Sequence, residues 1–401
     1  MPRPPGHDPR YESLDAWRGL ACLMVVLHHS GFALTWAEVG GTSGGDWARF
    51  LPVWFVRQMD LGVPLFFVIS GYCIAASLDA HRRRGASSWS FLRRRLRRIY
   101  PPYWVALLAF VMTTWGLDRA GLHHLHDGGH SLELTSPGEL NRAQWLGNIT
   151  LTETWRSRAW GGGAMEVFTR VAWSLCYEEQ FYLLSFLILL AAPRRLFPAL
   201  GIATAGIVGF RGFASDVGWL FSYEGSFIYL WHEFAVGLAV YWRLVHAESP
   251  RSKRLIDASL VGLMVMGLLT TMRSTWVASL FGLGLIALRD FDGPARRSGW
   301  LRACGRRCYS IYLIHLLVCT VGNEWLYGMG LVGFWARVLV MIPIVSTAAV
   351  GTGWLFFEAI ERHFLNRPAD HRPHPRPVAG EVPTMRGTFP RPPSEDASRD
   401  L

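Results

Sequence analysis

Long apolar runs recur along almost the whole sequence, and they restrict the possible folds more than any other feature. A helix needs about 20 mostly apolar residues to cross the roughly 30 Å hydrocarbon core of a bilayer. Hydrophobic residues make up 51% of the chain and charged residues only 17%, so polar surface is scarce. We therefore predict an all-α, polytopic membrane helix bundle, embedded in the lipid bilayer, with about ten transmembrane spans near 14–34, 61–79, 100–117, 172–192, 196–210, 225–245, 255–272, 275–289, 308–321 and 334–357.

The distribution of basic residues predicts how these spans are oriented. The net charge is +10, but Lys and Arg gather in short clusters between apolar runs, so nucleic-acid binding is not expected. The largest clusters fall in the connections 80–99 and 290–307, whereas the long connection 118–171 carries proportionally few basic residues. Because cytoplasmic connections are enriched in Lys and Arg, we predict a multi-pass protein of the plasma (inner) membrane with both termini cytoplasmic.

The two ends of the sequence differ from the apolar region between them. Residues 366–401 are rich in Pro and Arg and contain few apolar residues, and residues 1–12 have a similar composition. Such segments bury too little apolar surface to fold, so we predict a disordered cytoplasmic segment at each end. Residues 13–365 then form one membrane domain, and its six Cys, which include no C-x-x-C pair, are interpreted as apolar packing residues.

The first predicted span carries an unusual stripe of ionisable side chains. Arg18 and His29 are eleven residues apart, which places them about 16 Å apart on one face of a helix, and Asp15 lies one turn before Arg18. Ionisable residues are costly in lipid, so this face should line the bundle interior or a wet cavity. Spacing alone leaves two interpretations open: a reactive site at His29, or a structural Asp15–Arg18 ion pair with an interfacial histidine.

The fourth predicted span, which enters from the outer side, carries two adjacent acids near its start. Glu178 and Glu179 follow Trp173 and precede Tyr182 in an otherwise apolar run, where acids are rarely without a function. Glu178 should lie about 9 Å along this helix from its outer end. That depth could match the depth of His29.

Five arginines stand at the start of the third predicted span. They suit a topology anchor that also attracts anionic lipid. They equally suit a grip on phosphate, because a guanidinium group binds phosphate oxygens through two hydrogen bonds. The five are Arg93, Arg94, Arg95, Arg97 and Arg98.

Three further features allow more than one interpretation. Ser70-Gly71 leaves a small surface that suits helix packing or the passage of a thin substrate arm. His315 could line a cavity or belong to the core. The histidines of 123–130 could hold a metal, but no companion ligand motif accompanies them, so no metal site is predicted.

Taken in order, these residues resemble the acyltransferase-3 family of integral membrane acyltransferases, whose members acylate polysaccharides, lipopolysaccharide and some antibiotics. The likeness covers about residues 10–365, with Trp17 standing where the family usually has Leu or Ile. It rests on Leu14-Asp15-x-x-Arg18-Gly19, His29, Phe66-Phe67-Val68-Ile69-Ser70-Gly71, the Arg93–Arg98 run, Trp173-Ser174-Leu175-x-x-Glu178-x-x-Phe181-Tyr182, Tyr312-Leu313-Ile314-His315 and Glu361.

The resemblance implies an O-acyltransferase that uses acyl-CoA, usually acetyl-CoA, as a co-substrate from the cytoplasm, with no bound cofactor. His29 is expected to act as general base on the acceptor hydroxyl or to carry the acyl group briefly. Glu178 would orient His29 or stabilise its charge. Arg18 would hold the acyl donor or form an ion pair that lines the path of the donor. The arginine run would hold the nucleotide, and the predicted binding residues also include Asp15, Ser70, Trp173, Tyr182 and His315.

The identity of the acceptor is less constrained. Antibiotic-modifying members tend to have Thr-Gly-Leu-Arg where this chain has Asp15-Ala16-Trp17-Arg18, which favours an extracytoplasmic carbohydrate. A glycosylated natural product such as a macrolide is the alternative acceptor. A secondary transporter or exporter is the alternative from another class, although the sequence has no internal repeat and no paired, Gly- or Pro-broken helices. The oligomeric state stays open.

Overall fold

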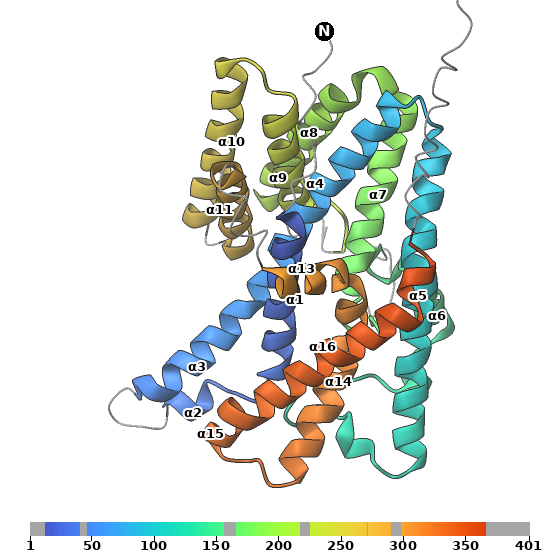
Figure 1. Cartoon of the computed structure of the whole chain (residues 1–401), viewed down its shortest axis with the longest axis vertical. Helices are drawn as coiled ribbons and strands as arrows, with labels where there is room; N and C mark the ends of the chain where they lie inside the picture. The colour runs from blue at the N-terminus through green and yellow to red at the C-terminus, as the bar shows by residue number, and fades with distance from the viewer. Residues whose placement is uncertain are drawn as a thin grey trace, which may run out of the picture. The chain divides into compact units, whose positions relative to one another are not determined.

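The computed structural model describes residues 13–40, 46–155, 166–216, 225–270, 272–289 and 298–365, and this part of the chain contains helices and no strand. The all-α prediction is therefore confirmed. The predicted disordered segments 1–12 and 366–401 lie outside the described residues. The principal helices are α1 (Leu14–Ser30), α4 (Gly62–Arg83), α5 (Ser88–Arg119), α7 (Trp173–Ala191), α8 (Leu196–Asp216), α9 (Trp231–Val245), α10 (Pro250–Leu269), α11 (Arg273–Ala287), α14 (Cys308–Gly328) and α16 (Ile342–Ala359) (Figure 1).

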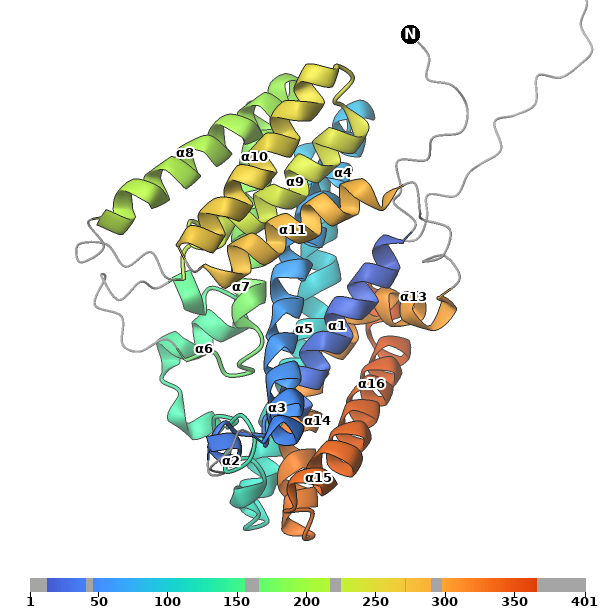
Figure 2. The same cartoon turned by 90° about the vertical axis from the view of Figure 1, so that its left-hand side faces the viewer.

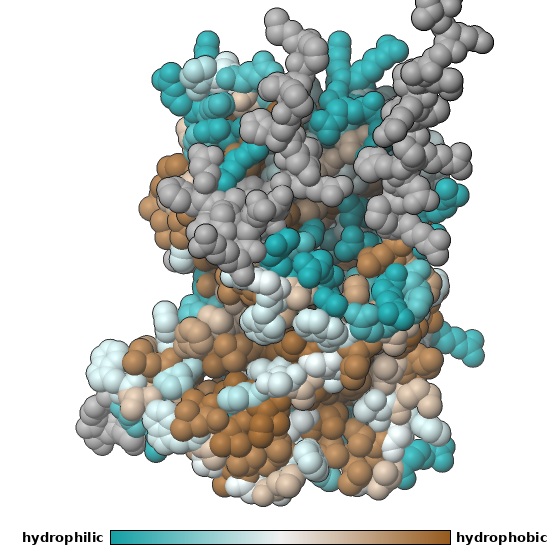
Figure 3. Space-filling model, viewed as in Figure 1, coloured by the Kyte–Doolittle hydropathy of each residue, from teal (hydrophilic) through white to brown (hydrophobic). Residues whose placement is uncertain are grey.

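Each predicted span coincides with one of these helices, but only some are long and apolar enough to cross a bilayer. Within the described residues three qualify, namely Trp47–Arg83, Trp173–Ala191 and Phe334–His363, and the shorter Arg273–Ala287 is also apolar. Apolar residues gather over α16 in the lower half of the face drawn in Figure 3. By contrast, α1 has 17 residues and carries Asp15 in its first turn. The count of ten spans and the cytoplasmic termini stay predictions.

Two of the segments between predicted spans contain additional helices. Within 35–60 lies α3 (Trp47–Gln58), and within 118–171 lies α6 (Arg142–Ile149). The side chain of Asn141 caps α6 by accepting hydrogen bonds from the backbone N–H groups of Ala143 and Gln144. Tyr103 of α5 donates to the carbonyl oxygen of Asn148 at 2.6 Å, so the long connection packs back along α5.

Glycines allow pairs of helices to approach backbone to backbone. A Cβ atom at Gly71 of α4 would lie 2.1 Å from the carbonyl oxygen of Phe234 in α9, and one at Gly237 would lie 2.0 Å from that of Val68. A Cβ at Gly305 of α13 (Gly299–Arg306) would likewise lie 1.6 Å from the carbonyl oxygen of Asp15. Helix packing thus accounts for Gly71 and draws α4, which carries Ser70, tightly against α9.

Two ends of the bundle are useful landmarks for the site. The arginine end is the part around the C-terminus of α4 and the first turns of α5, residues 80–98. The loop end is the part around the C-terminus of α5 and the segment that follows it, residues 118–136. Both views show α5 running from the arginine end to the loop end, α4 running from the middle of the bundle to the arginine end, and α14 leading towards the loop end (Figures 1 and 2).

Candidate active site

His29 lies in the last turn of α1, and the hydrogen bonds of its imidazole are made through Nδ1. Its Nδ1 is 2.9 Å from the carbonyl oxygen of Val25 and 3.2 Å from Nε2 of His315. His315 in turn places Nδ1 2.8 Å from the carbonyl oxygen of Tyr312, to which that nitrogen donates its proton. With both rings neutral, His29 therefore donates from Nδ1 to Val25 and His315. This tautomer leaves Nε2 of His29 unprotonated and able to accept a proton.

A cavity of about 770 Å³ opens beside His29 towards the loop end. Trp173 and Tyr177 supply aromatic surface in its wall. The wall also contains five charged side chains, which together give it both donors and acceptors of hydrogen bonds: Asp60, Glu166, Arg170, Glu233 and Arg273. We call this space the loop-end cavity.

A second, smaller cavity of about 120 Å³ lies towards the arginine end. Its wall includes most of the remaining residues that the sequence singled out, namely Arg18, Ser70, Arg95, Arg98, Glu178 and Tyr182, together with Cys73 and Cys308. The two cavities share three lining residues, Val63, Phe67 and Tyr312. His29 lines only the loop-end cavity, and these three side chains border both cavities.

Glu178 belongs to a polar group inside the arginine-end cavity. Ser70 donates a hydrogen bond to its Oε1 at 2.9 Å, and the hydroxyl of Tyr182 donates to the same oxygen at 2.5 Å. Tyr182 follows Glu178 by one helical turn, which explains why both face α4. The structure thus brings Ser70, Glu178 and Tyr182 together. His315, rather than Glu178, is the side chain hydrogen-bonded to His29.

Arg18 makes the predicted ion pair and also lines a cavity. Its Nη1 is 3.2 Å from Oδ1 of Asp15, and its Nη2 is 2.7 Å from Sγ of Cys73. A structural ion pair with Asp15 and a place in the site are therefore compatible for Arg18, since the pair fixes its guanidinium group at the wall of the arginine-end cavity. Cys73, interpreted from the sequence as a packing residue, points its sulfur at this group.

The five arginines of α5 divide according to helical phase. Arg95 and Arg98, one turn apart, line the arginine-end cavity, and the guanidinium of Arg95 lies 5.2 Å from the ring centre of Tyr182. Arg93 and Arg97 are exposed on another face. Arg94 contacts His81 and Ser90. Only two of the five predicted phosphate ligands are thus positioned to serve the cavity.

Two residues that shape the site, Arg170 and Glu361, were given no role in it from the sequence. Arg170 adopts a φ of +48°, which is uncommon for a residue other than glycine, and it lines the loop-end cavity. Glu361, buried completely, accepts hydrogen bonds from the backbone N–H and the hydroxyl of Ser310 at 3.1 and 2.6 Å. This contact anchors the start of α14, the helix that carries Tyr312 and His315. The match of Glu361 to the family pattern was a signal, but none marked Arg170.

An imidazole base lies at the wall of one cavity, and a smaller, arginine-lined cavity lies next to it. This arrangement suits a membrane-embedded enzyme that transfers a group between two substrates. Residues 11–356 match the acyltransferase domain of the acyltransferase-3 family, and the chain belongs to this family of membrane acyltransferases. It is 29% identical over 357 residues to BcsY of Komagataeibacter xylinus, a candidate membrane-bound transacylase, covering 84% of this chain and 80% of that protein. No solved structure matches the chain.

Proposed function

We propose that this membrane acyltransferase is an O-acyltransferase of the plasma (inner) membrane that crosses the bilayer several times. It moves an acyl group, acetyl in the simplest case, from acyl-CoA to a hydroxyl of an extracytoplasmic carbohydrate. The observation that carries this proposal is the pair of neighbouring cavities, which differ in volume and in lining and share Val63, Phe67 and Tyr312.

The arginine-end cavity suits the acyl donor. CoA carries a diphosphate and a ribose phosphate, and guanidinium groups such as those of Arg95 and Arg98 bind phosphate oxygens in pairs. The small volume of this cavity, which Ser70 and Cys73 also line, suits a thin pantetheine arm rather than a bulky group. The positive end of this path agrees with the predicted cytoplasmic entry of the donor.

The loop-end cavity suits a carbohydrate acceptor. It is several times larger, and its charged side chains can pair with many hydroxyl groups while Trp173 and Tyr177 offer flat apolar faces. A binding site of this kind can form hydrogen bonds with the hydroxyl groups of a sugar and pack against its apolar faces.

The chemistry of transfer centres on Nε2 of His29. This nitrogen takes the proton of the acceptor hydroxyl as the hydroxyl oxygen attacks the thioester carbonyl. The new C–O bond forms, the C–S bond breaks, and the proton passes to the departing CoA thiolate. A route in which Nε2 first carries the acyl group uses the same atom and the same partners. Val25 and His315 hold Nδ1 in either case.

Proteoliposomes containing the purified protein test the proposal directly. With radiolabelled acetyl-CoA outside or inside and an oligosaccharide on the opposite side, we expect label to appear in the sugar as an alkali-labile ester. A macrolide glycoside serves as the comparison acceptor. Translocation of an intact labelled compound without ester formation would instead support a transporter.

The division of the arginines predicts which of them bind the donor. The Arg95→Gln/Arg98→Gln variant is expected to raise the KM for acyl-CoA by roughly 10-fold or more, because a hydrogen bond to a charged group contributes about 1.5–3 kcal/mol. The matched control is Arg93→Gln/Arg97→Gln, which removes equal charge from the exposed face. A KM for acyl-CoA that is unchanged in both variants, measured by initial rates against acyl-CoA concentration, would identify the run as a topology anchor.

A further inference from the structure

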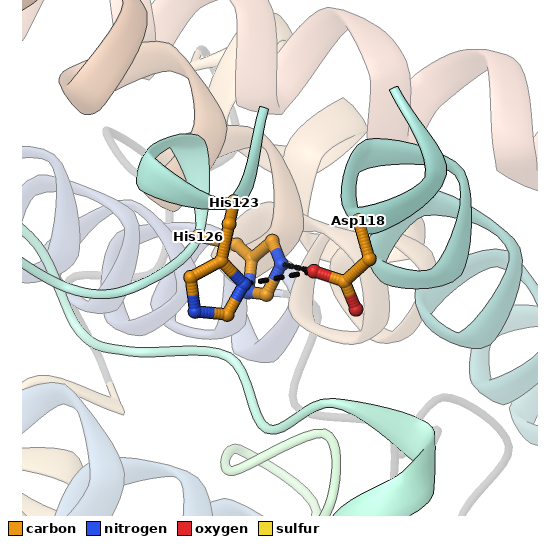
Figure 4. A group of neighbouring side chains, drawn as sticks. All are labelled: Asp118, His123 and His126. Carbon is orange, nitrogen blue, oxygen red and sulfur yellow. Dashed lines mark hydrogen bonds and ion pairs between the residues drawn. The ribbon is translucent and has the colours of Figure 1, made fainter. Parts of the chain in front are cut away.

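A second group of ionisable side chains lies at the loop end, where the chain leaves α5. Asp118 is in the last turn of α5, His123 begins the 3-10 helix η2 (His123–Leu125), and His126 follows it. Oδ1 of Asp118 is 2.8 Å from Nδ1 of His123 and 2.7 Å from Nε2 of His126 (Figure 4). The three atoms lie within 4.8 Å of one another, so one small ion can contact all of them.

Other contacts hold two of these side chains in place. Nδ1 of His126 is 3.2 Å from the carbonyl oxygen of Leu134, and Ser136 donates to Oδ2 of Asp118 at 3.0 Å. Metal-binding histidines and carboxylates are usually oriented by outer hydrogen bonds of this kind. The His126 ring is only 1% exposed, so both of its nitrogens need partners within the protein.

The contacts of His126 show what the cluster requires. When Nδ1 donates to the carbonyl oxygen of Leu134, a neutral ring directs the lone pair of Nε2 at the carboxylate of Asp118. Two lone pairs repel each other, so either a second proton or a cation has to lie between them.

Two imidazole groups and one carboxylate are ligands that suit Zn²⁺. Zn²⁺ binds imidazole nitrogens and carboxylate oxygens at about 2.0–2.2 Å in a tetrahedron, which sets its ligand atoms about 3.3 Å apart. The observed separations of Asp118 from the two histidines are slightly shorter. The side chains of His123 and Asp118 are 63% and 31% exposed, so both can move by the small distance required while the buried His126 stays in place. A water molecule completes the tetrahedron.

We propose that Asp118, His123 and His126 form a structural Zn²⁺ site that fastens the end of α5 to the segment 120–136. This segment also contacts α14, where Ser131 donates to Glu324 at 2.8 Å and Thr320 donates to the carbonyl oxygen of Leu132 at 2.8 Å. Leu132 lines the loop-end cavity. The metal therefore secures one wall of that cavity. From the sequence, only the histidines of 123–130 were considered, and they did not reveal the site because the third ligand, Asp118, lies before that segment.

Metal binding to the purified full-length protein in detergent tests this site. After removal of metal with a chelator, we expect the wild type to bind one equivalent of Zn²⁺, and Co²⁺ in its place to give the intense visible absorption of tetrahedral coordination. His123→Gln and Asp118→Asn should each weaken binding by at least about 10-fold. The control His124→Gln changes an exposed neighbour outside the cluster and should bind like the wild type.

Thermal unfolding distinguishes this site from the other histidines of the chain. Zn²⁺ should raise the Tm of the wild type and of His124→Gln, but not that of Asp118→Asn/His123→Gln. Equal Zn²⁺ affinity and equal Tm shifts in the double variant and the wild type would overturn the proposal, as would a wild type that binds no Zn²⁺. If the double variant does not fold, the exposed His123→Gln variant alone decides the question by the same two measurements.

Discussion

A His29→Ala enzyme is expected to transfer acyl groups about 10²–10⁴-fold more slowly than the wild type, which is the contribution of general-base catalysis. The geometry gives the reason. Val25 and His315 occupy Nδ1, which leaves Nε2 as the base, and His29 lines the loop-end cavity where the acceptor is proposed to bind. The measurement is the rate of transfer from labelled acetyl-CoA at saturating substrates.

The adjacent histidine offers a matched control. His28 lines the same cavity, but its Nδ1 is 3.2 Å from the carbonyl oxygen of Val56 and its ring serves a different neighbour. We expect His28→Ala to retain activity within a few-fold. Wild-type activity in His29→Ala would refute the role of His29. Equal losses in both variants, with unchanged thermal unfolding, would show that the shape of the cavity matters rather than the base.

The second large effect concerns stability. A Cβ at Gly237 would lie 2.0 Å from the carbonyl oxygen of Val68 and 2.6 Å from the backbone nitrogen of Tyr72, and neither atom can move without shifting α4. Gly237→Ala is therefore expected to destabilise the protein by about 1–3 kcal/mol, as overpacking does in other cores. Because Ser70 lies between these α4 residues, its hydrogen bond to Glu178 should weaken as well.

Gly262 of α10 provides the control for this substitution. A Cβ there meets nothing within 4 Å, so Gly262→Ala should keep or raise stability, since Ala favours a helix by about 1 kcal/mol over Gly. Unfolding of the purified variants in detergent by heat compares them. Equal midpoints for Gly237→Ala and the wild type would mean that α4 and α9 are not in close contact.

Local patterns in the sequence predicted the helices and the contacts within them. The apolar runs gave the positions of the main helices, and the three-residue spacing of Asp15 and Arg18 gave their ion pair. Helical spacing in the sequence was also enough to predict the division of the arginine run, because Arg95 and Arg98 share a helical face that excludes Arg93 and Arg97. Helix α3 was not predicted, and Pro52, a residue that disfavours helix interiors, lies within it.

Contacts between distant segments were beyond such patterns. The partner of His29 is 286 positions away, and the partner of Ser70 is 108 positions away, so no periodicity relates them. The prediction that Glu178 serves His29 assumed that equal depth brings side chains together. Depth along a helix does not specify the direction in which a side chain points, and α7 directs Glu178 at α4. The charges that line the loop-end cavity likewise depend on how the connecting segments fold.

The boundary that Val63, Phe67 and Tyr312 share between the two cavities has a consequence for the cell. An enzyme served by one substrate from each face of a membrane is at risk of becoming a leak for protons and metabolites. If the two cavities admit their substrates as proposed, a boundary that stays closed between turnovers keeps bulk solvent on the two sides apart. Only the acyl group would then have to cross it, and the ion gradients across the bilayer would survive each turnover.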